Sequence, residues 1–197
     1  MRPRLSRSEQ VERNRSALLD AAREVFLESG YVGATIDAIA ERAGFSTGVV
    51  YSQFGGKPDL FLALIERRIE ERAAEHDRVT EGLTGAAVIH ALIEASAADA
   101  NTHPGWTGVL IEFRALAARD PLLNKRYAEL HQRTVEQLAA AMARGSRSKN
   151  ASDMVVDAEI LLAFGSGITL ERAARPGAVP PGSDVTALCR AVGVSTP

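Results

Sequence analysis

The segment TIDAIAERAGFSTGVVYSQF, residues 35–54, has the pattern of two short helices joined by a tight turn. Ala40, Gly44 and Val50 stand at the spacing of a helical hairpin, with three residues between the first two and five between the last two. Gly44 supplies a turn geometry that a β-carbon would oppose. The small side chain of Ala40 lets the second helix cross closely, and Val50 closes the core between the helices. This pattern predicts a helix-turn-helix, whose second helix enters the major groove of DNA.

The outer face of the predicted second helix carries small, polar and hydrogen-bonding residues. They are Thr47, Gly48, Tyr51 and Ser52, which share one face at helical spacing. Such residues suit a helix that meets base edges in a groove, whereas the absence of arginine and lysine argues against strong bidentate reading of guanine. A helical hairpin with no role in DNA binding could show the same spacing. The rest of the chain must therefore distinguish a DNA-binding motif from an ordinary hairpin.

The remaining sequence is also typical of helices, because alanine, leucine, glutamate and arginine dominate and strand-like alternation is absent. A first helix is expected to begin at a capping box formed by Ser6 and Glu9 and to end at Gly30, as a left-handed cap. Glycines, prolines and polar stretches separate the further expected helices, which cover 57–77, 86–102, 106–119, 121–144, 152–174 and 184–192.

The predicted fold class is all-α. The chain has 197 residues, of which 46% are apolar, enough for a small domain beside a larger one with a buried core. We expect an N-terminal three-helix helix-turn-helix domain at residues 1–56. A larger C-terminal helical domain follows at residues 57–197, and the helix 57–77 connects the two.

Charge and cysteine usage narrow the function further. The formal net charge is −2, but residues 1–15 hold five arginines against two glutamates, so basic charge gathers next to the predicted DNA motif. Cys189 is the only cysteine, which excludes an intrachain disulfide and fits a reducing compartment. We find no signal peptide and no apolar stretch long enough to cross a bilayer, so the predicted location is the cytoplasm.

An enzyme and a helical interaction protein without DNA binding are the rival classes. The four histidines form no zinc-binding pair, and the lone cysteine has no close histidine. Neither a phosphate-binding glycine loop nor a G-x-S-x-G motif occurs. We therefore expect no catalytic residue, no metal and no cofactor. A footprint on the DNA upstream of the protein's own gene would separate a regulator from both rivals.

Residues 35–60 closely resemble the tetracycline-repressor (TetR) family of transcriptional regulators. The resemblance extends over about the first 65 residues and includes the preceding run with Ala21, Phe26, Gly30 and Tyr31, the aromatic pair Tyr51 and Phe54, and Lys57. It implies a homodimer with two DNA-reading heads and a larger helical effector domain. A ligand-responsive regulator follows, most readily a repressor, that binds a palindromic or near-palindromic double-stranded DNA operator and is released by a small-molecule effector.

The resemblance also implies roles by position. Thr35, Tyr51 and Lys57 are expected to contact phosphates, Lys57 at the start of a helix. Ser46 is expected to cap the second helix of the motif and to reach a phosphate. Thr47, Gly48 and Ser52 are expected to face base edges or the adjacent backbone.

The C-terminal domain is expected to hold the effector in a mainly apolar cavity with a few polar groups. Candidate lining residues lie on three of its helices: Trp106, Leu110, Phe113, Tyr127, His131, Phe164 and Ile168. Each of them is equally compatible with an ordinary core position. His131 or Glu112 would orient the ligand, which the sequence does not identify beyond a largely apolar molecule.

Residues 152–174 are apolar on nearly all sides, so other helices must cover them all round. Together with 184–192 they are expected to form a four-helix seam with a second copy of the chain, and Gly165, Ser166 and Gly167 would allow close approach. Burial within a single subunit is the alternative.

Overall fold

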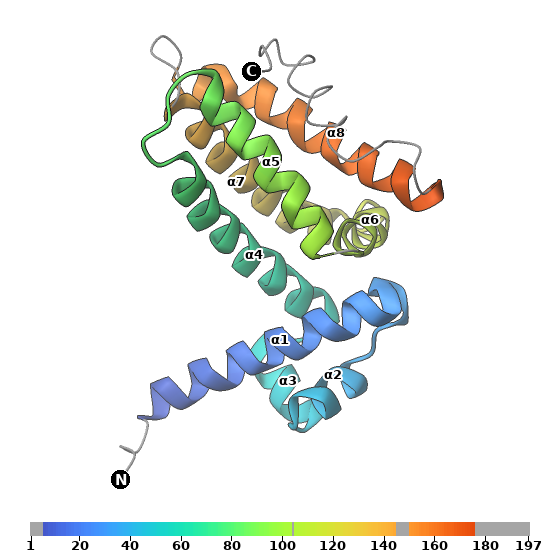
Figure 1. Cartoon of the computed structure of the whole chain (residues 1–197). Helices are drawn as coiled ribbons and strands as arrows, with labels where there is room; N and C mark the ends of the chain where they lie inside the picture. The colour runs from blue at the N-terminus through green and yellow to red at the C-terminus, as the bar shows by residue number, and fades with distance from the viewer. Residues whose placement is uncertain (1–5, 104, 145–149, 176–197) are drawn as a thin grey trace. The chain divides into compact units, whose positions relative to one another are not determined.

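The computed structural model describes residues 6–103, 105–144 and 150–175, and every regular element in these ranges is helical (Figure 1). The fold class is therefore all-α, as predicted. The elements are α1(Arg7–Gly33), α2(Ile36–Ala43), α3(Thr47–Phe54), α4(Lys57–Thr80), α5(Ala86–Thr102), α6(Trp106–Ala117), α7(Pro121–Arg144), the 3-10 turn η1(Ser152–Met154) and α8(Val155–Ala174). The expected helix 184–192 lies outside the described residues. None of the described helices is long and apolar enough to cross a membrane.

The chain packs as two compact units. The first comprises residues 1–67 and 109–127, and the second comprises residues 68–108 and 128–197. Thus α4, α6 and α7 each contribute residues to both units. This division reflects packing, whereas the functional boundary at residue 56 stays a prediction.

Local signals set the limits of α1. The side chain of Ser6 accepts a hydrogen bond from the Glu9 amide at 3.2 Å, and the Glu9 carboxylate accepts one from the Ser6 amide at 2.7 Å. The expected capping box is thus confirmed. Gly30 breaks the helix with φ 71° and ψ 172°, a positive φ but not the left-handed helical cap that we expected. A β-carbon there would lie 2.7 Å from Oε1 of Glu112, whose Oε2 accepts a hydrogen bond from the Val32 amide at 3.0 Å.

An aromatic cluster fills the core of the first unit. Its members come from α1, α4, α6 and α7, all are at most 7% exposed, and their ring centroids lie 4.7–5.9 Å apart in successive contacts: Phe26, Tyr31, Phe61, Phe113 and Tyr127. Phe113 touches three of the other four rings. Aromatic pairs at such distances add to the energy of burial.

Apolar faces of α5, α7 and α8 form the core of the second unit. Fully buried side chains from all three helices meet there, among them Val88, Leu92, Val135, Met142 and Ala158. Two faces of α8 differ sharply. Ala158 and Leu161 point into this core, while Val156, Ile160 and Phe164 are 62%, 46% and 38% exposed in the single chain.

Candidate DNA-binding surface and effector cavity

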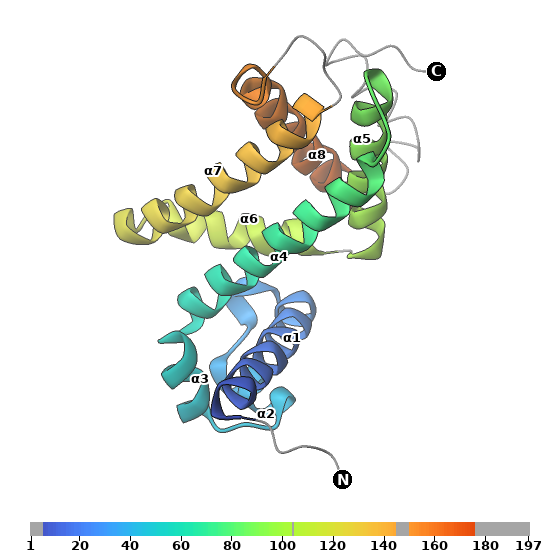
Figure 2. The same ribbon diagram turned by 90° about the vertical axis from the view of Figure 1, so that its left-hand side faces the viewer.

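The helix-turn-helix forms as predicted and lies against α1 (Figures 1 and 2). Thr35 begins α2 because its hydroxyl accepts a hydrogen bond from the Ala38 amide at 3.1 Å. Gly44 ends α2 in the left-handed conformation, with φ 72° and ψ 28°. Ile39 and Val50 are fully buried, and Ala40 is 2% exposed, so these side chains close the core between the two helices.

The outer face of α3 is largely open to solvent. Gly48, Tyr51 and Ser52 are exposed, Tyr51 to 55%, and Thr47 is half-buried. Ser46 stands at the N-cap position of α3, but its side chain makes no capping hydrogen bond, so the expected cap is absent. Its exposed hydroxyl remains suited to the expected phosphate contact.

Lys57 is placed differently from the expectation. Its ammonium donates to the carbonyl oxygens of Tyr31 at 2.9 Å, Val32 at 3.2 Å and Ala34 at 2.9 Å, and it lies 4.8 Å from the centroid of the Tyr31 ring. A lysine has three N–H donors, so all three are used within the protein. Burial lowers the pKa of Lys57, and the Glu112 carboxylate partly opposes that effect. The geometry therefore supports a role in joining α4 to the segment between α1 and α2, as an alternative to the expected phosphate contact of this side chain.

Two arginines of the first unit, one within the helix-turn-helix and one on α1, have different surroundings. Arg42 on α2 binds Glu24 and Glu28 on α1, with N–O distances of 3.0 and 2.7 Å, so its charge is paired within the protein. Arg15 on α1 places its guanidinium 4.6 Å from the ring centroid of Phe54, at the end of α3. Phe54 is only 7% exposed and packs rather than projects. Arg15 is thus a cation beside the recognition helix, a role that the sequence showed only as part of a basic N-terminus.

The second unit contains a cavity of about 200 Å³ between α4, α5, α8 and the start of α6. Two of the seven candidate residues, Trp106 and Ile168, line it. Phe113 and Tyr127 instead belong to the aromatic core of the first unit, and Phe164 is exposed on the outer side of α8. Leu110 and His131 are half-buried and do not line this cavity. This cavity therefore brings together two of the seven candidate residues, and the ligand-binding role of the others stays a prediction.

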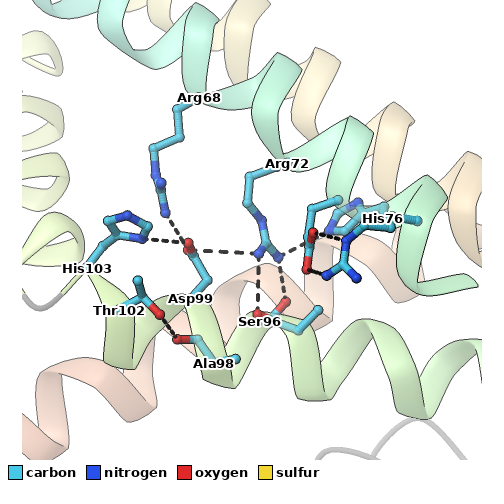
Figure 3. A network of polar contacts seen from close by, with 11 residues as sticks. Arg68, Arg72, His76, Ser96, Ala98, Asp99, Thr102 and His103 are labelled. Carbon is cyan, nitrogen blue, oxygen red and sulfur yellow. Dashed lines mark hydrogen bonds and ion pairs between the residues drawn. The ribbon is translucent and has the colours of Figure 1, made fainter. Parts of the chain in front are cut away.

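Charged residues that the sequence did not single out form the polar wall of the cavity. Arg72, Asp99, His103 and Arg172 all line it. Figure 3 shows Asp99 between Arg68, Arg72 and His103. The sequence signal for this site is weak, because charges at such positions usually mark a solvated helix face.

His76 lies next to this network and is 7% exposed. Its Nε2 lies 3.1 Å from Nη2 of Arg72, and its Nδ1 has no hydrogen-bond partner. Burial, followed by the charges of Arg72 and Arg144, lowers the pKa of His76 to about 4. The ring is therefore neutral at pH 7 and accepts a hydrogen bond from Arg72. Among the described residues, no group of three histidine, cysteine, aspartate or glutamate side chains could hold a metal ion.

Two family models match the chain. Residues 18–64 match the bacterial regulatory proteins of the tetR family, and residues 85–193 match the C-terminal part of BetI-type transcriptional repressors. The chain belongs to the TetR family. The first match includes the whole helix-turn-helix, and the second includes the described helices α5 to α8.

Curated relatives of this TetR-family chain are regulators. The transcriptional repressor AcnR of Corynebacterium diphtheriae is 30% identical over 77% of this chain and 73% of its own length. The transcriptional repressor Rv1474c of Mycobacterium tuberculosis is 31% identical over 76% of this chain and 73% of its own length. The TetR-family chain is thus a DNA-binding transcriptional regulator and not an enzyme.

Solved structures show the same fold. A transcriptional regulator from Rhodococcus sp. Rha1 aligns with a TM-score of 0.71 at 24% identity and covers 91% of this TetR-family chain and 94% of its own. The regulator FadR from Bacillus subtilis, solved in complex with stearoyl-CoA, aligns with a TM-score of 0.67 at 16% identity. It covers 90% of this chain and 94% of its own.

Proposed function

We propose that this regulator is a repressor that binds a palindromic or near-palindromic operator as a homodimer and is released by a small-molecule effector. The observation that carries the DNA-binding part is the exposed face of α3, formed by Gly48, Tyr51 and Ser52 in the helix-turn-helix. Repression is favoured because AcnR and Rv1474c, the relatives similar over three quarters of the chain, are repressors. The activator FasR of Mycolicibacterium smegmatis is 45% identical, but over 30% of this chain.

Residues 1–56 are the proposed DNA-binding domain, and residues 57–197 the proposed effector and dimer domain. Two copies of α3 would enter successive major grooves, which lie about 34–36 Å apart. The hydroxyls of Thr35, Ser46 and Tyr51 would bind phosphates, and Thr47, Gly48 and Ser52 would face base edges or the adjacent backbone. Arg15 would add electrostatic attraction at the end of α3.

Tyr51→Ala is expected to weaken operator binding by at least about tenfold, because a hydrogen bond to a charged phosphate contributes about 1.5–3 kcal/mol. The fold should persist, since Tyr51 is 55% exposed. Fluorescence anisotropy with a labelled duplex from upstream of the protein's own gene measures the affinity. Leu122→Ala, at a position 72% exposed, is the control and should bind like the wild type. Wild-type affinity in Tyr51→Ala would contradict the assignment of this face to DNA.

The exposed face of α8 supports the proposed dimer. Val156, Ile160 and Phe164 follow one another at intervals of four residues, and Gly167 and Leu170 continue the same stripe. An apolar stripe of this kind is stable in water when another surface covers it. We propose that residues 152–174, together with 184–192, form the seam with a second copy. Gly165 and Ser166, which we expected to allow close approach of the two copies, also line the cavity.

Ile160→Glu is expected to convert the dimer to a monomer at micromolar concentration, because an unpaired carboxylate would be buried in the seam. The monomer should keep its helical content, since Ile160 is 46% exposed in the single chain. Sedimentation velocity measures the mass. Leu122→Glu places the same charge on an exposed apolar position of α7 and should leave the dimer intact. A stable Ile160→Glu dimer would place the seam elsewhere.

Effector release is the third part of the proposal. The cavity between α4, α5, α6 and α8 supports it, and so does a structure of the same fold, FadR, which was solved with stearoyl-CoA. Effector and operator must then oppose each other reciprocally, so that each weakens the binding of the other by the same factor. Titrating the protein with an effector in the presence and absence of operator DNA tests this reciprocity.

A further inference from the structure

The cavity of the second unit has one apolar wall and one charged wall. Ile93, Trp106, Leu161 and Ile168 contribute to the apolar wall. The charged or ionisable residues of the other wall are Arg72, Arg172, Asp99 and His103. The chemistry of a ligand that fits here depends on whether these charges already neutralise one another.

Asp99 is already occupied. Arg68 donates a hydrogen bond to its Oδ2, and Nδ1 of His103 lies 2.9 Å from its Oδ1 (Figure 3). The negative charge of Asp99 is therefore already paired with the positive charge of Arg68. The guanidinium of Arg68 also lies 5.3 Å from the ring centroid of Trp106, which fixes this side of the cavity.

Arg72 has mostly neutral partners. Its guanidinium donates to Oγ of Ser96 at 3.0 Å and to the carbonyl of Ala95 at 3.4 Å, and it faces the neutral His76 ring. Its distance to the Asp99 carboxylate is 3.9 Å, well beyond the 2.7–2.9 Å of a charge-assisted hydrogen bond.

The surroundings of Arg72 give it little further compensation. Glu75, another carboxylate that acts on it, is bound by Arg78 through hydrogen bonds of 2.9 and 2.6 Å. Burial lowers the pKa of Arg72, which means that its charge is poorly solvated. An anion beside Arg72 would therefore be stabilised strongly, whereas a cation would meet Arg72 and Arg172.

We propose that this cavity binds a small organic carboxylate, with its carboxylate group against Arg72 and Arg172 and its hydrocarbon part against Trp106 and Ile168. The inference rests on the proposed function in one respect, that the bound carboxylate is the effector. A volume of about 200 Å³ lies below the roughly 300–1,000 Å³ of sites for drug-sized ligands. The ligand is therefore expected to be smaller than a drug-sized molecule.

Trp106 provides the readout, because it lines the cavity and is the only tryptophan of the chain. Its fluorescence is followed while the full-length protein is titrated with octanoate, 1-octanol or octylammonium at constant ionic strength. These probes share a chain length and differ in charge. Octanoate is expected to bind at least about tenfold more tightly than octanol, since a charge-assisted hydrogen bond contributes about 1.5–3 kcal/mol, and octylammonium should bind most weakly.

Two variants locate the interaction. Arg72→Gln keeps a hydrogen-bond donor for Ser96 but removes the charge, so octanoate should bind about ten- to a hundredfold more weakly while octanol is unaffected. Arg175→Gln, at a side chain 75% exposed, is the matched control and should bind octanoate like the wild type. If circular dichroism shows that Arg72→Gln is unfolded, Arg172→Gln takes its place. The comparison of the three probes on the wild type still tests whether the cavity prefers a carboxylate.

Three results would overturn the proposal: no fluorescence change with octanoate, equal affinity for octanol or octylammonium, or undiminished octanoate affinity in a folded Arg72→Gln. Fluorescence anisotropy with the labelled upstream duplex distinguishes failure of the carboxylate site from failure of the proposed function. Operator binding without octanoate binding would reject the cavity ligand and leave DNA recognition standing. Octanoate binding that leaves operator affinity unchanged would confirm the site and reject its role as the effector site.

Discussion

Phe113→Ala is expected to lower the free energy of unfolding by about 3–5 kcal/mol. Phe113 is fully buried, and its ring centroid lies 5.0 Å from that of Tyr31, 4.7 Å from Phe61 and 5.9 Å from Tyr127. Alanine would remove these contacts and leave a cavity that the surrounding rings could fill only in part. Chemical denaturation, followed by circular dichroism, measures the change.

Leu116→Ala is the matched control for this substitution. Leu116 lies on the same helix, α6, but is 41% exposed, so its truncation should cost less than about 1 kcal/mol. If Phe113→Ala kept wild-type stability and lost binding of octanoate instead, Phe113 would belong to a ligand pocket and the aromatic core would need to be reinterpreted.

Lys57→Met is expected to destabilise the protein by about 2–3 kcal/mol, since a methionine of similar length leaves the carbonyls of Tyr31 and Ala34 without their part-buried donor. Operator affinity should fall as a result. The dependence of log affinity on log salt should nevertheless keep its slope, because the lost ammonium does not neutralise a phosphate. Denaturation and salt titrations of DNA binding measure the two effects.

Lys125→Met, which removes an exposed lysine on α7, should leave stability unchanged and serves as the control. A reduction of the salt slope by about one in Lys57→Met, with stability intact, would restore the phosphate contact that the family resemblance implied. The two interpretations of Lys57 therefore lead to opposite pairs of results.

Features set by neighbouring residues could be predicted from the sequence. The capping box of Ser6 and Glu9, the turn at Gly44 and the helix of residues 86–102 each depend on residues a few positions apart, and all three formed as expected. The helix-turn-helix core was predictable for the same reason, because Ala40 and Val50 belong to one short hairpin.

Features set by distant contacts could not be predicted. The acceptors of Lys57 lie 23–26 residues earlier in the chain, and no local pattern distinguishes them from a phosphate. Phe113 and Trp106 are both aromatic residues of α6, yet one is core and the other lines a cavity. Arg72 resembled a solvent-facing charge because its partners, Ser96 and Asp99, lie on another helix.

The hydrogen bond from Val32 to Glu112 joins residues 80 positions apart, and it has a consequence for synthesis on the ribosome. Residues 1–67 emerge before residues 109–127, which complete the same unit with Glu112 and Phe113. At about 5–20 residues per second, the delay is on the order of several seconds. During this delay, the rings of Tyr31 and Phe61 in the nascent chain lack their contacts with Phe113. A chimaera that transfers only residues 1–67 to another regulator lacks Glu112 and Phe113. The new host must therefore supply side chains that replace them.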